Sequence, residues 1–168
     1  MVTEKAEIAD PGRKPSGPLR RGWTTGACAT AATKAALTAL LTGKFPDPVT
    51  ITLPKGETPA FALARETLGD DFAEAGIVKD AGDDPDVTHG ATIVARVARA
   101  SPGTGIVFRA GDGVGTVTKA GLPIPPGEPA INPVPRAMMT KEVEALCAEH
   151  GVAPDVEVTV SVPRGRDL

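Results

Sequence analysis

The spacing of apolar residues divides the chain into a helix, a block of strands, a second helix and a last strand. From 26 to 42, alanines and leucines recur with helical spacing, which predicts the first helix. A hydroxyl of Thr24 or Thr25 is expected to cap its N-terminus, because such an oxygen accepts a bond from an unpaired backbone N–H. Gly43 is expected to end the helix in the left-handed conformation.

Two-residue alternation and β-branched residues dominate the middle of the chain. They predict strands at 49–53, 60–65, 75–79, 92–99, 105–109 and 114–118. Six prolines between 121 and 136 are expected to exclude regular structure from that stretch, because proline lacks a backbone donor.

A second helix is expected at 140–150 and a last strand at 155–162. Four residues of the helix have the spacing of a core-facing stripe: Val143, Leu146, Cys147 and His150. The strands come in a block and do not alternate with helices. The pattern therefore predicts an α+β fold, with a mostly antiparallel sheet packed against two helices and no Rossmann core.

Composition and charge narrow the class of protein. The 168 residues are 41% hydrophobic and 23% charged, which is typical of a globular domain. The sequence has no apolar run of about 18 residues and no secretory leader pattern, so we expect a cytoplasmic protein without a membrane span. Few aromatics (3%) and a net charge of −3 argue against a nucleic-acid partner.

The N-terminal residues differ in character from the rest. Residues 1–18 mix charges with three prolines and lack periodicity, so a disordered tail is expected ahead of one domain at 19–168. Cys28 and Cys147 form no metal-binding pattern and fall in the expected helices. A role as small buried hydrophobes is favoured, while a disulfide or a nucleophile stays open.

The densest polar segment is 79–90, which places four aspartates, a lysine, a threonine and a histidine between two strands. Loops on a rigid sheet often carry sites, and these side chains can orient a substrate or transfer a proton. A site for a hard cation and a solvated turn are the alternatives, and all three stay open.

Three further segments are candidate parts of a site. The glycines at 111, 113 and 115 are expected in a hairpin turn or in a turn that a ligand approaches closely. They lack the following helix of a dinucleotide-binding loop, so that interpretation is rejected. Hydroxyls and Arg20 and Arg21 at the start of the first helix indicate either capping or an anion site. The proline-rich loop 121–136 is expected to be rigid and to present Asn132 and Arg136.

These segments resemble the cobalt-precorrin-5B C-1 methyltransferase family, known as CbiD. The resemblance is carried by RGWTTGACA at 21–29, KDAGDDPDVTHG at 79–90, GVGTVTK at 113–119 and PPGEPAINPVPR at 125–136, and it extends from about residue 19 to 162. It implies transfer of a methyl group from S-adenosylmethionine to C-1 of a corrinoid intermediate, which gives cobalt-precorrin-6A. The cobalt belongs to the substrate, so no protein metal is implied, and a homo-oligomer stays open.

Motif membership and side-chain chemistry together give the expected site. The expected catalytic residues are Asp80, Asp83, Asp84 and His89. The expected substrate- or donor-binding residues are Arg21, Thr24, Thr25, Gly26, Lys79, Asp86, Thr88, Gly113, Gly115, Lys119, Asn132 and Arg136. Lysine and arginine can pair with the carboxylates of the macrocycle, and the aspartates can face the cationic sulfonium. Arg136 has an alternative role, in which it fastens its own loop by bonding backbone carbonyls.

Members of the family are longer than this chain, so the family's C-terminal domain is expected to lie outside it. Two other functions therefore stay open. One is a non-catalytic corrinoid-binding module. The other is a metal-dependent hydrolase built on the acidic segment 79–90.

Overall fold

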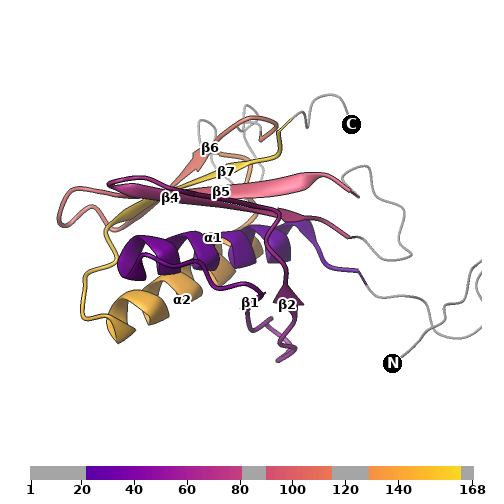
Figure 1. Cartoon of the computed structure of the whole chain (residues 1–168), viewed down its shortest axis with the longest axis horizontal. Coiled ribbons are helices and arrows are strands. Elements are labelled where there is room, and N and C mark those ends of the chain that lie inside the picture. The colour runs from indigo at the N-terminus through magenta and orange to yellow at the C-terminus, as the bar shows by residue number, and fades with distance from the viewer. Residues whose placement is uncertain (1–21, 81–89, 115–128, 164–168) are drawn as a thin grey trace, which may run out of the picture.

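The computed structural model describes residues 22–80, 90–114 and 129–163, which form a sheet with two helices on one face (Figure 1). In chain order the elements are α1 (Thr25–Thr42), β1 (Val49–Thr50), β2 (Ala60–Phe61), β3 (Arg65–Leu68), β4 (Phe72–Val78), β5 (Thr92–Arg99), β6 (Ile106–Ala110), α2 (Pro133–Glu149) and β7 (Val156–Ser161).

The main sheet has five strands in the order β3-β4-β5-β7-β6. Neighbours are antiparallel except β6 and β7, which run parallel. Strands β1 and β2 form a separate antiparallel pair. The expected α+β class with a mostly antiparallel sheet is confirmed, whereas the parallel pair was not foreseen.

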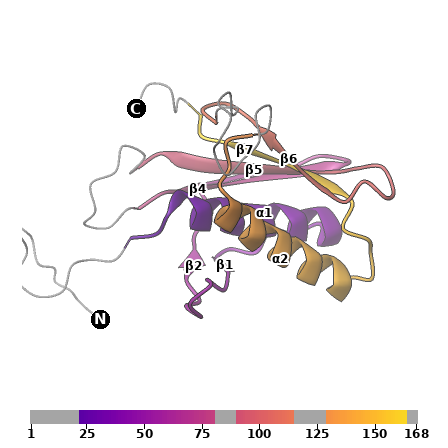
Figure 2. The ribbon, with the colours of Figure 1, turned by 180° about the vertical axis from the view of Figure 1, so that it is seen from behind.

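Helix α1 lies between the sheet and α2, as both views of the ribbon show (Figure 2). It packs on β4 and β5 on one side and on α2 on the other. An element enclosed in this way is buried nearly all round, which requires small side chains for close packing. The alanines that run through α1 meet this requirement, and Ala31, Ala32, Ala35 and Ala36 have no exposed surface.

Both ends of α1 follow the sequence prediction. Thr24 adopts an extended conformation and its Oγ1 accepts a hydrogen bond from the Ala27 N–H at 3.0 Å. At the other end Gly43 has φ +86°, and its N–H donates to the Ala39 carbonyl. A left-handed residue of this kind ends a helix with least strain when it is glycine.

The core fills the two interfaces of α1. One face of the sheet contributes alternate residues of β4, β5 and β7, namely Ala73, Ala75, Ile77, Ile93, Ala95, Val97, Val156, Val158 and Val160. Helix α2 contributes Met139, Val143, Leu146 and Cys147. The hydroxyl of Thr33 donates to the Ala29 carbonyl and also reaches the Met139 sulfur at 3.4 Å, so this buried polar group is satisfied.

Helix α2 begins seven residues before the expected start at 140, and the exclusion of regular structure up to 136 is wrong for 133–136. Pro133 and Pro135 lie in the first turn, where backbone N–H groups have no intrahelical acceptor, so proline costs no hydrogen bond there. His150 is also misassigned to the core stripe. It is exposed and occupies the C-cap of α2.

The strand boundaries differ at several places. The expected strand 49–53 is reduced to β1, 60–65 is divided between β2 and the start of β3, and 75–79 begins earlier as β4. Val114 lies in a turn, and the rest of the expected strand 114–118 lies outside the described residues. The expected tail at 1–18 also lies outside them.

Candidate functional site

The loops of interest gather at one end of the main sheet. Strand β4 ends where β5 begins, since Val78 pairs with Thr92. The antiparallel pairing of Val94 with Ser161 brings the end of β7 to the same end of the sheet. The parallel pairing of Ala110 with Val160 adds the end of β6. The segments that follow β4, β6 and β7 therefore leave the sheet at the same end, which is called the loop end below.

The starts of both helices lie at this end. The Trp23 N–H, two residues before α1, donates to the Asp80 carbonyl at 2.9 Å. A methyl group built on Gly26 would lie 2.7 Å from Cγ of Pro135, so the first turns of α1 and α2 touch. Glycine at this position allows the contact, because any side chain would displace the neighbouring helix. Of the predicted site residues, Thr24, Thr25 and Gly26 are thus brought together with Asp80 and the start of α2.

Lys79 and Asp80 continue the end of β4. The Lys79 N–H donates to the Ala91 carbonyl, and the Lys79 carbonyl accepts from the Gly90 N–H, both at 2.8 Å. These bonds hold the two sides of the segment 79–90 together. The Lys79 residue is only 2% exposed, whereas Asp80 is exposed. Of this pair, only Asp80 is directly accessible to a ligand in solvent.

Cys28 lies beside this segment, one turn into α1. Burial raises its pKa from 9.0 to about 11, with Lys79 lowering the pKa and Asp80 raising it as smaller effects. A thiol with such a pKa is protonated at neutral pH and is a poor nucleophile. Cys28 and Cys147 are both buried and free, which confirms that they serve as small hydrophobic residues.

Arg136 is bonded to the backbone of the segment before α2. Its Nε donates to the Ile131 carbonyl and its Nη2 to the Pro129 carbonyl, each at 2.7 Å. The guanidinium carbon also lies 5.6 Å from the centre of the Phe108 ring on β6. These contacts are those of the alternative role, in which Arg136 fastens its loop. Asn132 is the exposed N-cap residue of α2, and its side chain makes no capping bond.

Gly113 belongs to the turn after β6. It has φ +75° and is exposed. The turn is held by the Val114 N–H, which donates to the Gly111 carbonyl, and by the Val162 N–H, which donates to the Asp112 carbonyl. Gly113 is therefore at the same end of the sheet as Asp80 and the helix starts.

The remaining predicted site residues lie outside the described part of the chain. They are Arg21, Asp83, Asp84, Asp86, Thr88, His89, Gly115 and Lys119, and Arg20 accompanies them. Within 22–80, 90–114 and 129–163, no group of three or more His, Cys, Asp or Glu side chains is arranged to hold a metal ion. The metal-dependent alternative relies mainly on 81–89, so it stays a prediction.

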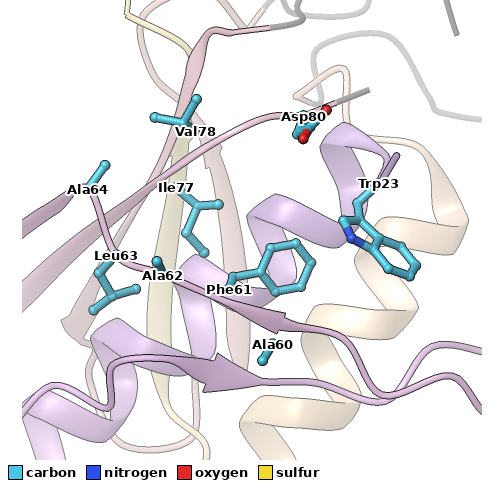
Figure 3. Close-up of a pocket in the computed structure, with 9 residues that line it drawn as sticks. All are labelled: Trp23, Ala60, Phe61, Ala62, Leu63, Ala64, Ile77, Val78 and Asp80. Carbon is cyan, nitrogen blue, oxygen red and sulfur yellow. The ribbon is translucent and has the colours of Figure 1, made fainter. Parts of the chain in front are cut away.

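A pocket of about 360 Å³ lies beside Asp80 and was not predicted from the sequence (Figure 3). Trp23 and Asp80 line it together with residues 60–64 and the end of β4. The rings of Trp23 and Phe61 meet edge to face, with centroids 6.3 Å apart and planes at 66°. Aromatic residues are only 3% of the chain, so two of them at one pocket is a notable concentration.

The described chain is thus an α+β protein whose candidate site is built by loops and helix starts at one end of a mixed sheet. None of its described helices combines the length and apolar character needed to cross a bilayer. A profile of the CbiD family matches residues 12–168, and the chain belongs to this family.

Two curated relatives are named cobalt-precorrin-5B C(1)-methyltransferase. The one from Brucella anthropi is 72% identical over 150 residues, and the one from Brucella ovis is 71% identical over the same length. Each alignment covers 89% of this chain but 41% of the relative. The chain therefore spans about two fifths of the length of these relatives.

A solved structure shares the fold. It is described as a cobalamin biosynthesis protein (cbiD) from Archaeoglobus fulgidus and superposes with a TM-score of 0.65 at 29% sequence identity. The superposition covers 89% of this chain and 45% of that one. The resemblance inferred from the sequence motifs is therefore confirmed at the level of family and of fold.

Proposed function

We propose that this chain takes part in the transfer of a methyl group from S-adenosylmethionine to C-1 of cobalt-precorrin-5B, which yields cobalt-precorrin-6A. The observation that carries the proposal is the 72% identity to a relative named for this methyl transfer. At this identity most side chains of any shared site are the same. The methyl donor in this proposal is the one that the resemblance to the family implies.

The chemistry asks mainly for positioning. Methyl transfer from a sulfonium needs the carbon nucleophile in line with the breaking carbon–sulfur bond, and holding two reactants in such geometry removes much of the entropic barrier. An end of a sheet at which several loops and two helix starts gather offers contacts from many directions. This arrangement supports a site for two ligands at the loop end of the sheet.

The predicted site residues take three roles in this proposal. Thr24, Asp80, Gly113 and Asn132 are exposed at the loop end, so we assign ligand contact to them. Lys79 is buried and Arg136 is bonded to carbonyls, so we assign them support of the loops. We keep Asp83, Asp84 and His89, which were expected to be catalytic together with Asp80, as the proposed catalytic group, since Asp80 and Gly90 on either side lie at this end.

A second function, corrinoid binding without turnover, is favoured by one observation. The chain spans about two fifths of its relatives, which are 41% covered. If methyl transfer needs groups from the rest of such a relative, these residues bind the corrinoid without transferring a methyl group to it.

Labelled methyl transfer separates the two functions. The chain and the longer Brucella anthropi relative are each incubated with cobalt-precorrin-5B and donor carrying a labelled methyl group, and calorimetry measures corrinoid binding to the chain. Label in the corrinoid with the chain alone supports the enzyme, and binding without label supports the second function. If the chain neither transfers the label nor binds the corrinoid, both functions are contradicted.

A matched pair of variants tests the acidic segment. Asp83→Asn with Asp84→Asn removes two adjacent charges from the proposed site, and Asp70→Asn with Asp71→Asn removes two from the β3–β4 turn. The first variant is expected to lower kcat/KM for methyl transfer by at least about tenfold. Loss of an acid–base group typically lowers the rate by about 10²–10⁴-fold. The second is expected to leave it unchanged, and equal effects would remove 83–84 from the site.

A further inference from the structure

The pocket beside the start of α1 has a composition of its own. Its floor is apolar, with Phe61 and Ile77 buried and Leu63 half-buried. The half-buried Trp23 and the exposed, acidic Asp80 also line it. In Figure 3 the Phe61 ring points toward Trp23, and Asp80 lies near Trp23 by the start of α1. Apolar walls with a few placed polar groups are typical of small-molecule sites.

The pocket is rigidly built at its polar edge. The backbone bond from Trp23 to the Asp80 carbonyl joins the residue before α1 to the residue after β4. The Ala64 N–H donates to the Gly76 carbonyl at 2.8 Å, which holds the 60–64 segment against the same strand. The segments that carry Trp23 and residues 60–64 are therefore tied to β4 and Asp80 by backbone hydrogen bonds.

Size decides between the two ligands of the proposed reaction. About 360 Å³ is near the lower limit of the roughly 300–1,000 Å³ usual for ligand pockets. A corrinoid with its acid side chains is several times larger than a nucleoside and does not fit. Its carboxylates would also be repelled by Asp80 and would find no partner on the apolar floor.

The charge at the pocket also favours the methyl donor over the corrinoid. A cation is attracted to the face of an aromatic ring, most strongly to tryptophan, and to a carboxylate. Trp23 and Asp80 combine these two attractions at one opening. The apolar floor with Phe61 suits a flat base or an aliphatic chain, so the complementary ligand joins a positive centre to an apolar or aromatic group.

We propose that this pocket binds an adenosyl sulfonium, with the adenine and ribose against Phe61 and Ile77 and the positive sulfur between Trp23 and Asp80. This assignment rests on the proposed function, and it names where the methyl donor is held. In the transfer the corrinoid carbon supplies the electron pair of the new carbon–carbon bond, and the sulfur keeps the pair of the broken bond. The donor then becomes a neutral thioether, which loses its attraction to Trp23 and Asp80.

The sequence provides a direct probe, because Trp23 is the only tryptophan and the chain has no tyrosine. Its fluorescence is measured while S-adenosylmethionine, S-adenosylhomocysteine and adenosine are titrated into the 168-residue chain. A saturable change in emission is expected with S-adenosylmethionine. Binding of the neutral thioether is expected to be about 3- to 30-fold weaker, from the combined loss of a cation–π contact and an exposed ion pair.

Two variants at opposite ends of the same strand locate the charge effect. Asp80→Asn is expected to reduce the preference for the sulfonium over the thioether by about 1.5- to 5-fold. Asp70→Asn makes the same change at the exposed turn before β4 and is expected to leave the preference unaltered. Phe61→Leu is expected to weaken all three ligands alike, and its melting temperature shows whether the fold is kept.

Calorimetry on the same samples separates failure of the pocket from failure of the proposed function. Donor binding by calorimetry without a Trp23 response, or without an effect of Asp80→Asn, overturns the pocket and leaves the methyl transfer standing. An absence of donor binding to the chain, while the Brucella anthropi relative transfers label, also overturns the pocket alone. An absence of transfer by the relative as well contradicts the proposed function.

Discussion

The guanidinium of Arg136 is bonded to the backbone of the segment that leads into its own helix. Two N–H groups reach the carbonyls of Pro129 and Ile131, in a geometry that the fork of arginine matches and lysine does not. The structure thus gives this residue a clear stabilising task at the loop end. Its expected contact with a substrate carboxylate stays a prediction.

Replacing this residue tests the stabilising task. Arg136→Lys is expected to lower stability by about 1–2 kcal/mol, because one of two charge-assisted bonds to carbonyls is lost. For a chain of this size the melting temperature falls by about 2–8 °C. Arg109→Lys, which alters an exposed ion pair with Glu157, serves as the control and should change melting by much less. Unchanged melting in Arg136→Lys would contradict the task.

Cys28 links stability to alkaline pH. Its pKa is raised to about 11 in the folded chain, so between pH 9 and 11 the folded state holds a proton that the unfolded state releases. The contribution of the protonated Cys28 thiol to the free energy of unfolding is therefore complete below pH 9 and is lost as the pH rises through 11. The two-unit shift corresponds to about 2–3 kcal/mol.

Urea unfolding from pH 8 to pH 11 checks this dependence. The free energy of unfolding should decline more steeply in the natural chain than in Cys28→Ala, whose absolute stability is lower because of the methyl-sized gap. The comparison uses slopes with pH, so the gap does not affect it. Parallel slopes would show that Cys28 titrates alike in both states.

At the scale of elements, the contact of the two helix starts depends on the size of one residue. Gly26→Ala places a methyl group against Pro135 and is expected to cost about 1–3 kcal/mol despite the better helix propensity of alanine. Pro135→Ala removes Cγ, which would lie 2.7 Å from the added methyl group, and keeps Cβ, which would lie 3.1 Å from it. In the double variant the cost of Gly26→Ala should largely disappear, which a double-mutant cycle of melting curves measures. Additive effects would rule out the clash.

Local signals account for which elements were predictable. The alanine run, the Thr24 hydroxyl and Gly43 all act within one helix, so the bounds of α1 follow from the sequence. The start of α2 does not, because the rule that proline breaks helices applies to interiors, and Pro133 and Pro135 lie in the first turn. The alternation at 49–53 indicates a strand, but only Val49 and Thr50 pair with β2, and β1 packs against α1.

At the scale of the whole molecule, α1 is the element around which the others are arranged. It is enclosed between the sheet and α2, and β1 also contacts it. Hydrogen exchange should therefore be slowest in α1 and in the central strands β5 and β7, and fastest in the pair β1–β2. Peptide-level mass spectrometry measures this order. Exchange in α1 as fast as in β1–β2 would mean that the enclosing layers open independently.

The candidate site was predictable only in part, because the pocket depends on contacts between segments that are distant in the sequence. Thr24, Asp80 and the α2 start lie in segments whose glycines, prolines and charges mark them individually. The pocket requires Trp23 and Phe61 to meet, and the path that brings 60–64 beside β4 is set by tertiary contacts. No local sequence pattern at Trp23 or at 60–64 predicts that these two segments contact each other.

The position of β7 has a consequence for how the protein is made. It is the last of the described strands, yet it lies between β5 and β6 and is the described strand that pairs with β6. During synthesis 45 residues separate the end of β6 at Ala110 from the start of β7 at Val156. At about 5–20 residues per second the ribosome needs about 2–9 s to add them. For that time β6 has none of the described strands as a partner and β5 exposes an open edge, which favours pairing with another nascent chain. A chaperone that covers exposed strand edges should therefore raise the soluble yield of the chain.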